Sequence, residues 1–172
     1  MTHEGLRIRA ETAADTQSIE AVTAAAFLEA PHTSGTEQYI VNALRRAGKL
    51  TLSLVAEIDA RVVAHVALSP VSISDGSAGW FGLGPVSVLP QLQGRGIGSR
   101  LVREALRMLR ESGASGCVVL GEPEYYGRFG FKADSNLVLP GPPAEYFQAI
   151  AFHPVNARGT VMYHEAFEAA RD

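Results

Sequence analysis

The chain has 172 residues, of which 47% are hydrophobic and 19% charged, a balance typical of one globular domain with a sizeable core. Its formal net charge of −3 provides no overall basic field, which argues against a nucleic-acid partner. No apolar run approaches the roughly 20 residues that a membrane span needs, and the first residues lack the apolar core of a signal peptide. Cys117 is the single cysteine, so no disulfide framework forms within the chain and we expect a cytoplasmic location.

The first third of the chain has the pattern of one strand and two helices. Residues 6–9 alternate apolar and basic side chains, which predicts a strand. Thr12 followed by Asp15, and Ser34 followed by Glu37, have the spacing of capping boxes, and apolar residues at helical spacing follow each pair. Both pairs therefore predict the start of a helix.

The middle of the chain changes to a strand pattern. Residues 50–58 and 62–73 are rich in β-branched and apolar side chains, and the turn residues between them predict a hairpin. A further turn at residues 75–77 precedes a predicted strand over residues 80–88. Four strand-like runs thus come before the glycine-rich segment of the chain.

The strongest helix pattern covers residues 98–112, with apolar side chains on one face and four arginines on the opposite face. The short apolar run 117–120 predicts a buried central strand, so strand, helix and strand form a right-handed parallel crossover. A short helix is predicted around residues 125–129, and two last strands are predicted over 146–152 and 160–164.

Between the fourth strand and this helix lies a glycine-rich turn, Gln93-Gly94-Arg95-Gly96-Ile97-Gly98-Ser99. The first N–H groups of a helix have no partner inside the helix, and they carry the positive end of its dipole. Glycines let an anion approach the backbone closely. The turn therefore predicts a ring of N–H donors for a phosphate or diphosphate. Arg95 and Arg100 can add positive charge at the rim of the turn. For the arginine stripe of the helix two readings stay open: Arg100 or Arg103 reaches the phosphates, or the stripe is only a solvated face.

Two other phosphate-binding loops do not fit this turn. The P-loop pattern G-x-x-x-x-G-K-[ST] is absent. The dinucleotide pattern G-x-G-x-x-G fails because Ser99 stands at the third position after Gly96, and such a loop usually follows the first strand. A tight connection without a ligand, and a domain that binds another nucleotide, remain as alternatives.

The pattern Gln93-x-x-Gly96-x-Gly98 after a strand resembles the signature of the GNAT superfamily of acyl-CoA-dependent N-acyltransferases. The order of elements agrees with that family from about residue 6 to 164, and segments 83–88 and 119–131 resemble a bacterial subgroup of mostly undefined acceptors. The resemblance implies an α+β fold in a single domain over residues 1–172. It would have a mixed, strongly twisted sheet of six or seven strands, flanked by about four helices.

The resemblance also implies how acetyl-CoA is bound as cosubstrate. Backbone groups of Val86, Ser87 and Val88 would pair with the pantetheine arm and face the thioester, while the amides of residues 94–99 hold the diphosphate. Pro85 supports the first role, because it lacks an N–H and weakens pairing with a neighbouring strand. A released strand exposes backbone groups that an extended, amide-bearing ligand can satisfy. An ordinary bulge at Pro85 is the alternative.

Amine acylation needs a proton for the departing thiolate. Tyr126 lies four residues before Gly130, which matches the family pattern Tyr-x-x-x-Gly-Phe, in which the tyrosine points at the sulfur. A phenol, with an ordinary pKa of about 10, can donate that proton. Tyr126 is therefore the expected catalytic acid, with a packing aromatic as the alternative reading and Tyr125 as the second candidate.

The general base is not evident. The strand before the turn carries no acid, although some family members place a carboxylate there. The candidates are water, Glu29, His32, Glu37 and His65, where Glu37 also fits a helix cap and His65 also fits a core position.

We therefore expect an N-acetyltransferase that moves an acetyl group from acetyl-CoA directly to the amine of a small molecule or peptide. The alternative is a non-catalytic CoA-binding regulatory module, which only the missing base supports. No His, Cys, Asp and Glu cluster has metal-ligand spacing, so no metal is expected, nor is a nucleic-acid or membrane partner. A homodimer through the apolar last strands is compatible with the sequence.

Overall fold

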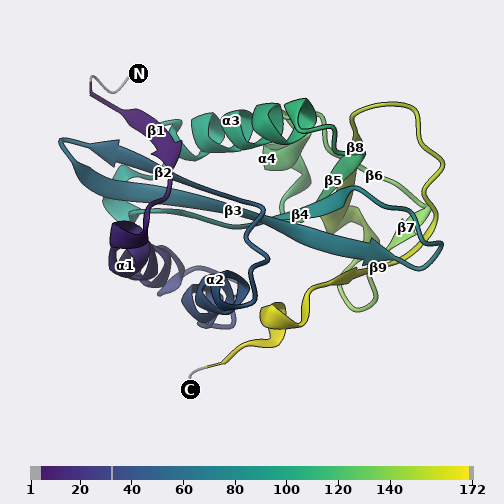
Figure 1. Ribbon diagram of the computed structural model, residues 1–172, viewed down its shortest axis with the longest axis horizontal. Coiled ribbons are helices and arrows are strands. Elements are labelled where there is room, and N and C mark those ends of the chain that lie inside the picture. The colour runs from purple at the N-terminus through teal and green to yellow at the C-terminus, as the bar shows by residue number, and fades with distance from the viewer. Residues whose placement is uncertain (1–4, 32, 171–172) are drawn as a thin grey trace.

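The computed structural model describes residues 5–31 and 33–170, which share one mixed sheet (Figure 1). The strands are β1 (Arg7–Ala10), β2 (Leu52–Ile58), β3 (Arg61–Ile73), β4 (Trp80–Val88), β5 (Gly116–Leu120), β6 (Lys132–Ala133), β7 (Leu137–Val138), β8 (Phe147–Ala151) and β9 (Gly159–Tyr163). Their order is β1-β2-β3-β4-β5-β8-β6, and β9 pairs with β3 and β7. In the described part of the chain seven strands have four residues or more, so the predicted α+β sheet is confirmed. The last two strands pair with other strands of the same chain, since β8 lies between β5 and β6 and β9 pairs with β3 and β7.

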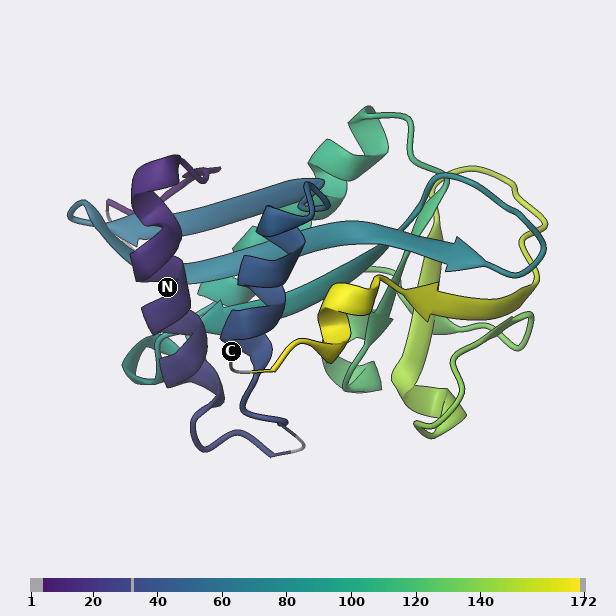
Figure 2. The same cartoon turned by 60° about the horizontal axis from the view of Figure 1, so that its bottom comes forward.

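Helices cover both faces of the sheet. The α-helices are α1 (Thr16–Phe27), α2 (Glu37–Arg46), α3 (Ile97–Glu111) and α4 (Pro123–Gly127), and the 3-10 turns are η1 (Ala13–Asp15), η2 (Pro90–Leu92), η3 (Ala144–Tyr146) and η4 (Glu165–Glu168). Helices α1 and α2 lie on one face, and α3 and α4 lie on the other (Figure 1). Strand β9 runs beside the second half of β3, and η4 rests on α2 (Figure 2). No described helix has both the length and the hydropathy to span a lipid bilayer.

The predicted helix starts are close to the observed ones. The Thr12 backbone N–H donates to the Asp15 carboxylate over 2.7 Å, and the chain makes one 3-10 turn before α1 begins. Helix α2 begins at Glu37 rather than directly after Ser34, because Gly35 has a φ of 75° and Thr36 is the N-cap residue, while the Ser34 N–H donates to the Glu37 carboxylate ahead of the helix. Helix α4 begins two residues before the predicted range, because Pro123 supplies a preset backbone angle at the first helical position.

The core explains why α3 is the strongest helix in the sequence. Its apolar face, Leu101, Val102, Ala105 and Leu109, is 0% exposed against the sheet. Burial of such aliphatic side chains contributes roughly 1.5–3 kcal/mol each for the larger ones. A second cluster, which includes Trp80, Val118, Phe147 and Val161, fills the space between β5, β8 and β9. These two clusters fix the relative position of β4 and β5, between which the candidate site lies.

Strands β4 and β5 form a fork. They pair in parallel only from Trp80–Gly116 to Gly82–Val118, so in the described structure residues 83–88 of β4 have no strand partner on that side. On the other side, the pairing of β4 with β3 shifts register between Val66 and Leu68, opposite Pro85. The predicted parallel crossover is confirmed. Both interpretations of Pro85 apply, because β4 has a bulge on the side of β3 and unpaired backbone on the side of β5.

Candidate active site

The glycine-rich turn forms the head of α3. Gly94 and Gly96 have φ angles of 77° and 84°, and Gly96 is the N-cap residue of the helix. The amide of Gln93 donates to Pro90, but the amides of residues 94–99 donate to no atom of the described residues. The side-chain amide of Gln93 donates to the Val88 carbonyl over 3.0 Å and so ties the turn to the end of β4. Several consecutive N–H groups at a helix start are thus available to an anion, as predicted.

A cavity of about 310 Å³ opens over this turn. It is lined by Val88, Leu92, Gln93, Gly94, Gly96, Ile97, Gly98, Ser99, Tyr125 and Arg128. The Tyr125 hydroxyl lies 3.5 Å from the Ser99 hydroxyl, and the Arg128 guanidinium lies over the Tyr125 ring at 4.6 Å. Arg128 was not predicted, although its spacing of three residues from Tyr125 on a short helix puts the two side chains on one face.

The arginines expected at the rim lie elsewhere. Arg100 and Arg103 line a separate groove of about 460 Å³ on the outer face of α3, together with Arg107. Arg103 stacks on Phe129 at 4.9 Å. The exposed Arg95 contributes its backbone amide to the turn, but its side chain is not among the described residues that line the cavity. The positive side chain at the turn is therefore Arg128.

A larger groove of about 720 Å³ continues from the turn into the fork. It is lined by Ala25, Ala26, Phe27, Leu28, Glu29, Ala30, Pro31, Val86, Val88, Pro90, Gln93, Gly98, Tyr125 and Tyr126. The Ser87 side chain points away from the groove, because its hydroxyl lies 3.3 Å from that of Thr23 in the buried contact with α1. Val86 and Val88 line the groove, whereas the Ser87 side chain does not, and the predicted binding role of the backbone groups of residues 86–88 stays a prediction. The end of α1, a wall of small and apolar residues, was not predicted.

Tyr126 lies where the groove meets the fork. A Cβ on Gly121, which follows β5, would collide with Cε2 of Tyr126, so the glycine gives the ring its place. The rings of Tyr125 and Phe131 meet it edge-on at 5.0 and 6.0 Å. Burial, and then the neighbouring Tyr125 phenol, raises the pKa of Tyr126 to about 12. The hydroxyl donates to none of the described residues and remains protonated near neutral pH.

The candidate bases lie in different places. Glu29 is exposed and lines the groove, so it is the predicted candidate that the structure brings to the site. One carboxylate oxygen of Glu37 accepts hydrogen bonds from the Thr33 hydroxyl and the Ser34 N–H, which is the capping role. His32 lies outside the described residues. Within the described part of the chain, no group of three or more His, Cys, Asp or Glu side chains is placed to hold a metal ion.

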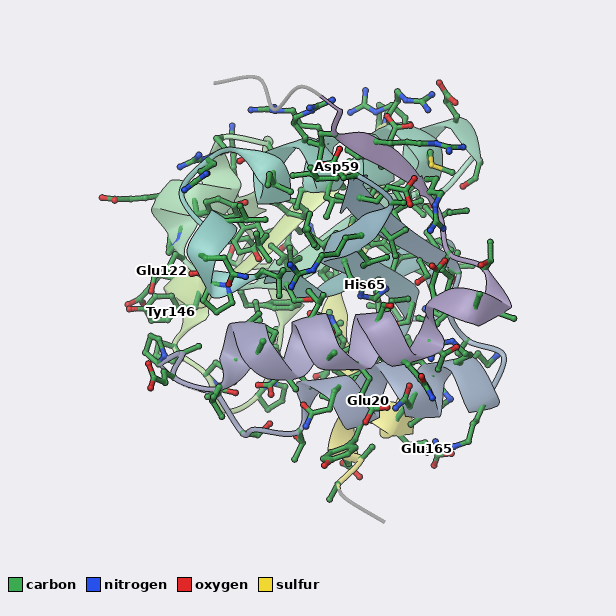
Figure 3. All side chains as sticks on the ribbon, turned by 90° about the vertical axis from the view of Figure 1, so that its left-hand side faces the viewer. Glu20, Asp59, His65, Glu122, Tyr146 and Glu165 are labelled. Carbon is green, nitrogen blue, oxygen red and sulfur yellow. The ribbon has the colours of Figure 1, made fainter. Side chains whose placement is uncertain are left out.

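His65 belongs to the core rather than to the groove. It is 0% exposed on β3, behind helix α1 (Figure 3), and its Nε2 lies 2.7 Å from the Ser53 hydroxyl. Ser53 donates to Glu11, which pairs with Arg45 at 2.9 Å. Burial lowers the pKa of His65 to about 4, despite the opposing field of Glu11. The ring is therefore neutral at pH 7 and is a hydrogen-bonded core residue.

This burial predicts a measurable pH dependence of stability. The folded pKa of His65 is about 4, below its unfolded value of 6.5, so the unfolded chain binds the extra proton first as pH falls. The free energy of unfolding should therefore fall by about 3 kcal/mol between pH 7 and pH 4 through this residue. In His65→Gln this part of the pH dependence should be missing, as measured by urea unfolding at both pH values. Equal losses in the variant and in the unmodified protein would contradict the assignment.

The fold and site together define a class of protein, an acyltransferase with an anion-binding turn beside a split sheet. The family model described as "Acetyltransferase (GNAT) domain" matches residues 7–133. The chain therefore belongs to the GNAT acetyltransferase family.

Individual relatives are similar to this chain over nearly its whole length. The chain is 35% identical over 167 residues to the protein from Escherichia coli K12 called uncharacterized N-acetyltransferase YhbS, covering 93% of this chain and 97% of that one. It is also similar to a GNAT family acetyltransferase from Brucella melitensis, solved in complex with acetyl-CoA, with 50% identity, 96% and 99% of the two chains covered and a TM-score of 0.86. The crystal structure of Escherichia coli YhbS in complex with CoA covers 95% of this chain and 92% of its own at 34% identity, with a TM-score of 0.87.

Proposed function

We propose that residues 1–172 form one N-acetyltransferase domain that takes acetyl-CoA as cosubstrate and acetylates an amine of a small molecule or peptide. The observation that carries this proposal is a run of unpartnered amides, residues 94–99, opening directly into the groove of the fork. The two cavities share Val88, Gln93, Gly98 and Tyr125, so one ligand can occupy both. Strands β8 and β9 follow the matched family region and extend the same sheet, which supports a single domain.

In this proposal the chain holds the cosubstrate mainly through its backbone. The amides of residues 94–99 bind the diphosphate, and Arg128 adds the one positive side chain that lines the described turn cavity. Unpaired backbone groups between Val86 and Val88 satisfy the amides of the pantetheine arm, as an added strand would. The ligand then runs from the turn along β4, and its thioester lies between β4 and Tyr126.

The proposed transfer is direct. The amine nitrogen attacks the thioester carbonyl carbon, the carbon–sulfur bond breaks, and the departing sulfur takes the Tyr126 proton. The attacking nitrogen loses its own proton to water or to Glu29, which lines the groove. Tyr126 is suited to the acid role because its pKa of about 12 keeps the hydroxyl protonated until the sulfur leaves.

A screen of amines with acetyl-CoA, read by the release of free thiol, tests the function. Spermidine, a tripeptide with a free amino terminus and an aminoglycoside represent three acceptor classes. We expect thiol release above the acetyl-CoA background with at least one of them. Tight binding of acetyl-CoA without release above background in a wide panel would instead favour the CoA-binding module. A cytoplasmic location also belongs to this proposal, because the lone Cys117 is a buried thiol.

A further inference from the structure

A second tyrosine, Tyr163 of β9, lies at the apex of the fork. Gly82 is the last residue of β4 that pairs with β5. A Cβ on Gly82 would collide with Cε1 of Tyr163 and would lie 3.2 Å from Cγ1 of Val71. The tyrosine ring therefore rests directly on the β4 backbone at the point where the two strands separate.

Tyr163 and Tyr126 approach the fork from opposite faces of the sheet. The Tyr163 ring packs on Phe167 of η4 at 4.9 Å, and η4 lies against α2 (Figure 2). The Tyr126 ring packs instead with Phe129 and Phe131, and Arg103 of α3 covers Phe129. Helices α1 and α2 lie on one face of the sheet, and α3 and α4 lie on the other (Figure 1). The contacts of Tyr163 are therefore with elements of the first face, and those of Tyr126 are with elements of the second.

The Tyr163 hydroxyl is a neutral polar group without a protein partner in the described structure. It is part of the apolar cluster around Val118 and Phe147, yet no hydrogen bond joins its oxygen to another described residue. Burial raises the pKa of Tyr163 strongly, and the neighbouring Cys117 and Tyr126 raise it further. The hydroxyl therefore keeps its proton, and its oxygen can still accept a hydrogen bond.

We propose that Tyr163 is an acceptor-binding residue, whose hydroxyl oxygen accepts a hydrogen bond from the incoming amine and aims its lone pair at the thioester. This inference rests on the proposed function. The groove is lined by Tyr125 and Tyr126 from one side and by the end of α1 from the other. The cosubstrate would occupy the part beside Tyr125 and Tyr126, and the amine would approach the thioester from the face of α1 and α2, where β9 places Tyr163 against Gly82. The protonated Tyr163 phenol adds no negative charge that would stabilise the ammonium form of the acceptor, as a carboxylate at this place would.

The test is steady-state kinetics of Tyr163→Phe in the full chain, with the best amine from the acceptor screen. Loss of one hydrogen bond to a neutral group should raise the KM for the amine about fivefold to tenfold. The Kd of acetyl-CoA should stay within about twofold of the unmodified value. Tyr39→Phe is the matched control, because it deletes a phenol oxygen from α2 on the same face of the sheet, and its KM should not change.

A second variant separates the hydroxyl from the ring position. Gly82→Ala keeps the hydroxyl but displaces the ring by the collision described above, so it should raise the KM for the amine as well. Unchanged KM and kcat in Tyr163→Phe would overturn the role of Tyr163 while leaving the transferase function intact. Failure of the unmodified protein to release thiol with any amine would overturn the proposed function, and the role of Tyr163 with it.

Discussion

Replacing Tyr126 with Phe should lower kcat about 100-fold and leave the Kd of acetyl-CoA unchanged. A loss of this size in kcat is typical when an enzyme loses a positioned acid that protonates the leaving group in the transition state. The ring keeps its place, because its contacts with Gly121 and Phe131 do not involve the hydroxyl. Thiol-release kinetics at saturating amine give kcat, and calorimetry with acetyl-CoA gives the Kd.

The adjacent phenol provides the control. Tyr125→Phe removes a hydroxyl that lies at the turn, 3.5 Å from Ser99, and should weaken acetyl-CoA binding severalfold without lowering kcat. Because the pKa of Tyr126 is about 12, kcat of the unmodified protein should also show no loss through Tyr126 as pH rises to 10. Equal kcat for Tyr126→Phe and the unmodified protein would remove Tyr126 from the mechanism.

Replacing Ser99 with Asp should weaken acetyl-CoA binding about 100-fold, while the folded protein keeps its stability. Ser99 is the third residue of α3 and lines the turn cavity. A carboxylate there would repel a diphosphate held on the neighbouring amides. The same carboxylate lies at the positive end of the helix dipole, which stabilises a helix by about 0.3–1 kcal/mol. Calorimetry with acetyl-CoA and thermal unfolding without it measure the two effects.

Ser99→Asn isolates the charge, since asparagine has nearly the shape of aspartate. It should lose less than about tenfold in affinity for acetyl-CoA. If both variants bind equally well, the anion does not lie at this helix start. If both lose 100-fold, the side-chain volume and not the charge is responsible.

Local patterns determined much of the fold. The hydrophobic periodicity of α3 and the β-branched runs of β2 and β3 depend on neighbours in the chain, so the elements could be predicted within a few residues. The start of α2 was less accurate, because Thr33 and Ser34 both bond the Glu37 carboxylate before the helix begins. Such sharing of one carboxylate by the Thr33 hydroxyl and the Ser34 backbone N–H cannot be read from the spacing alone.

The candidate site was predictable where it is a continuous segment. The turn, Val86 and Val88 are such cases, because a helix start and an adjacent strand are local features. The end of α1 and Tyr163 could not be found in this way. They reach the fork through packing of distant segments, as when Gly82 leaves room for a ring on β9. His65 was a candidate base that also fitted a core position, and its contact with Ser53 in the buried interior agrees with the core position.

The central claim is that backbone amides at the start of α3 hold a diphosphate and so direct a thioester into the fork. A crystal structure of this protein with acetyl-CoA tests it directly. We predict diphosphate oxygens at about 2.7–3.2 Å from amides of residues 94–99, and the sulfur next to the Tyr126 hydroxyl. A diphosphate bound instead in the arginine-lined groove on the outer face of α3 would contradict the account.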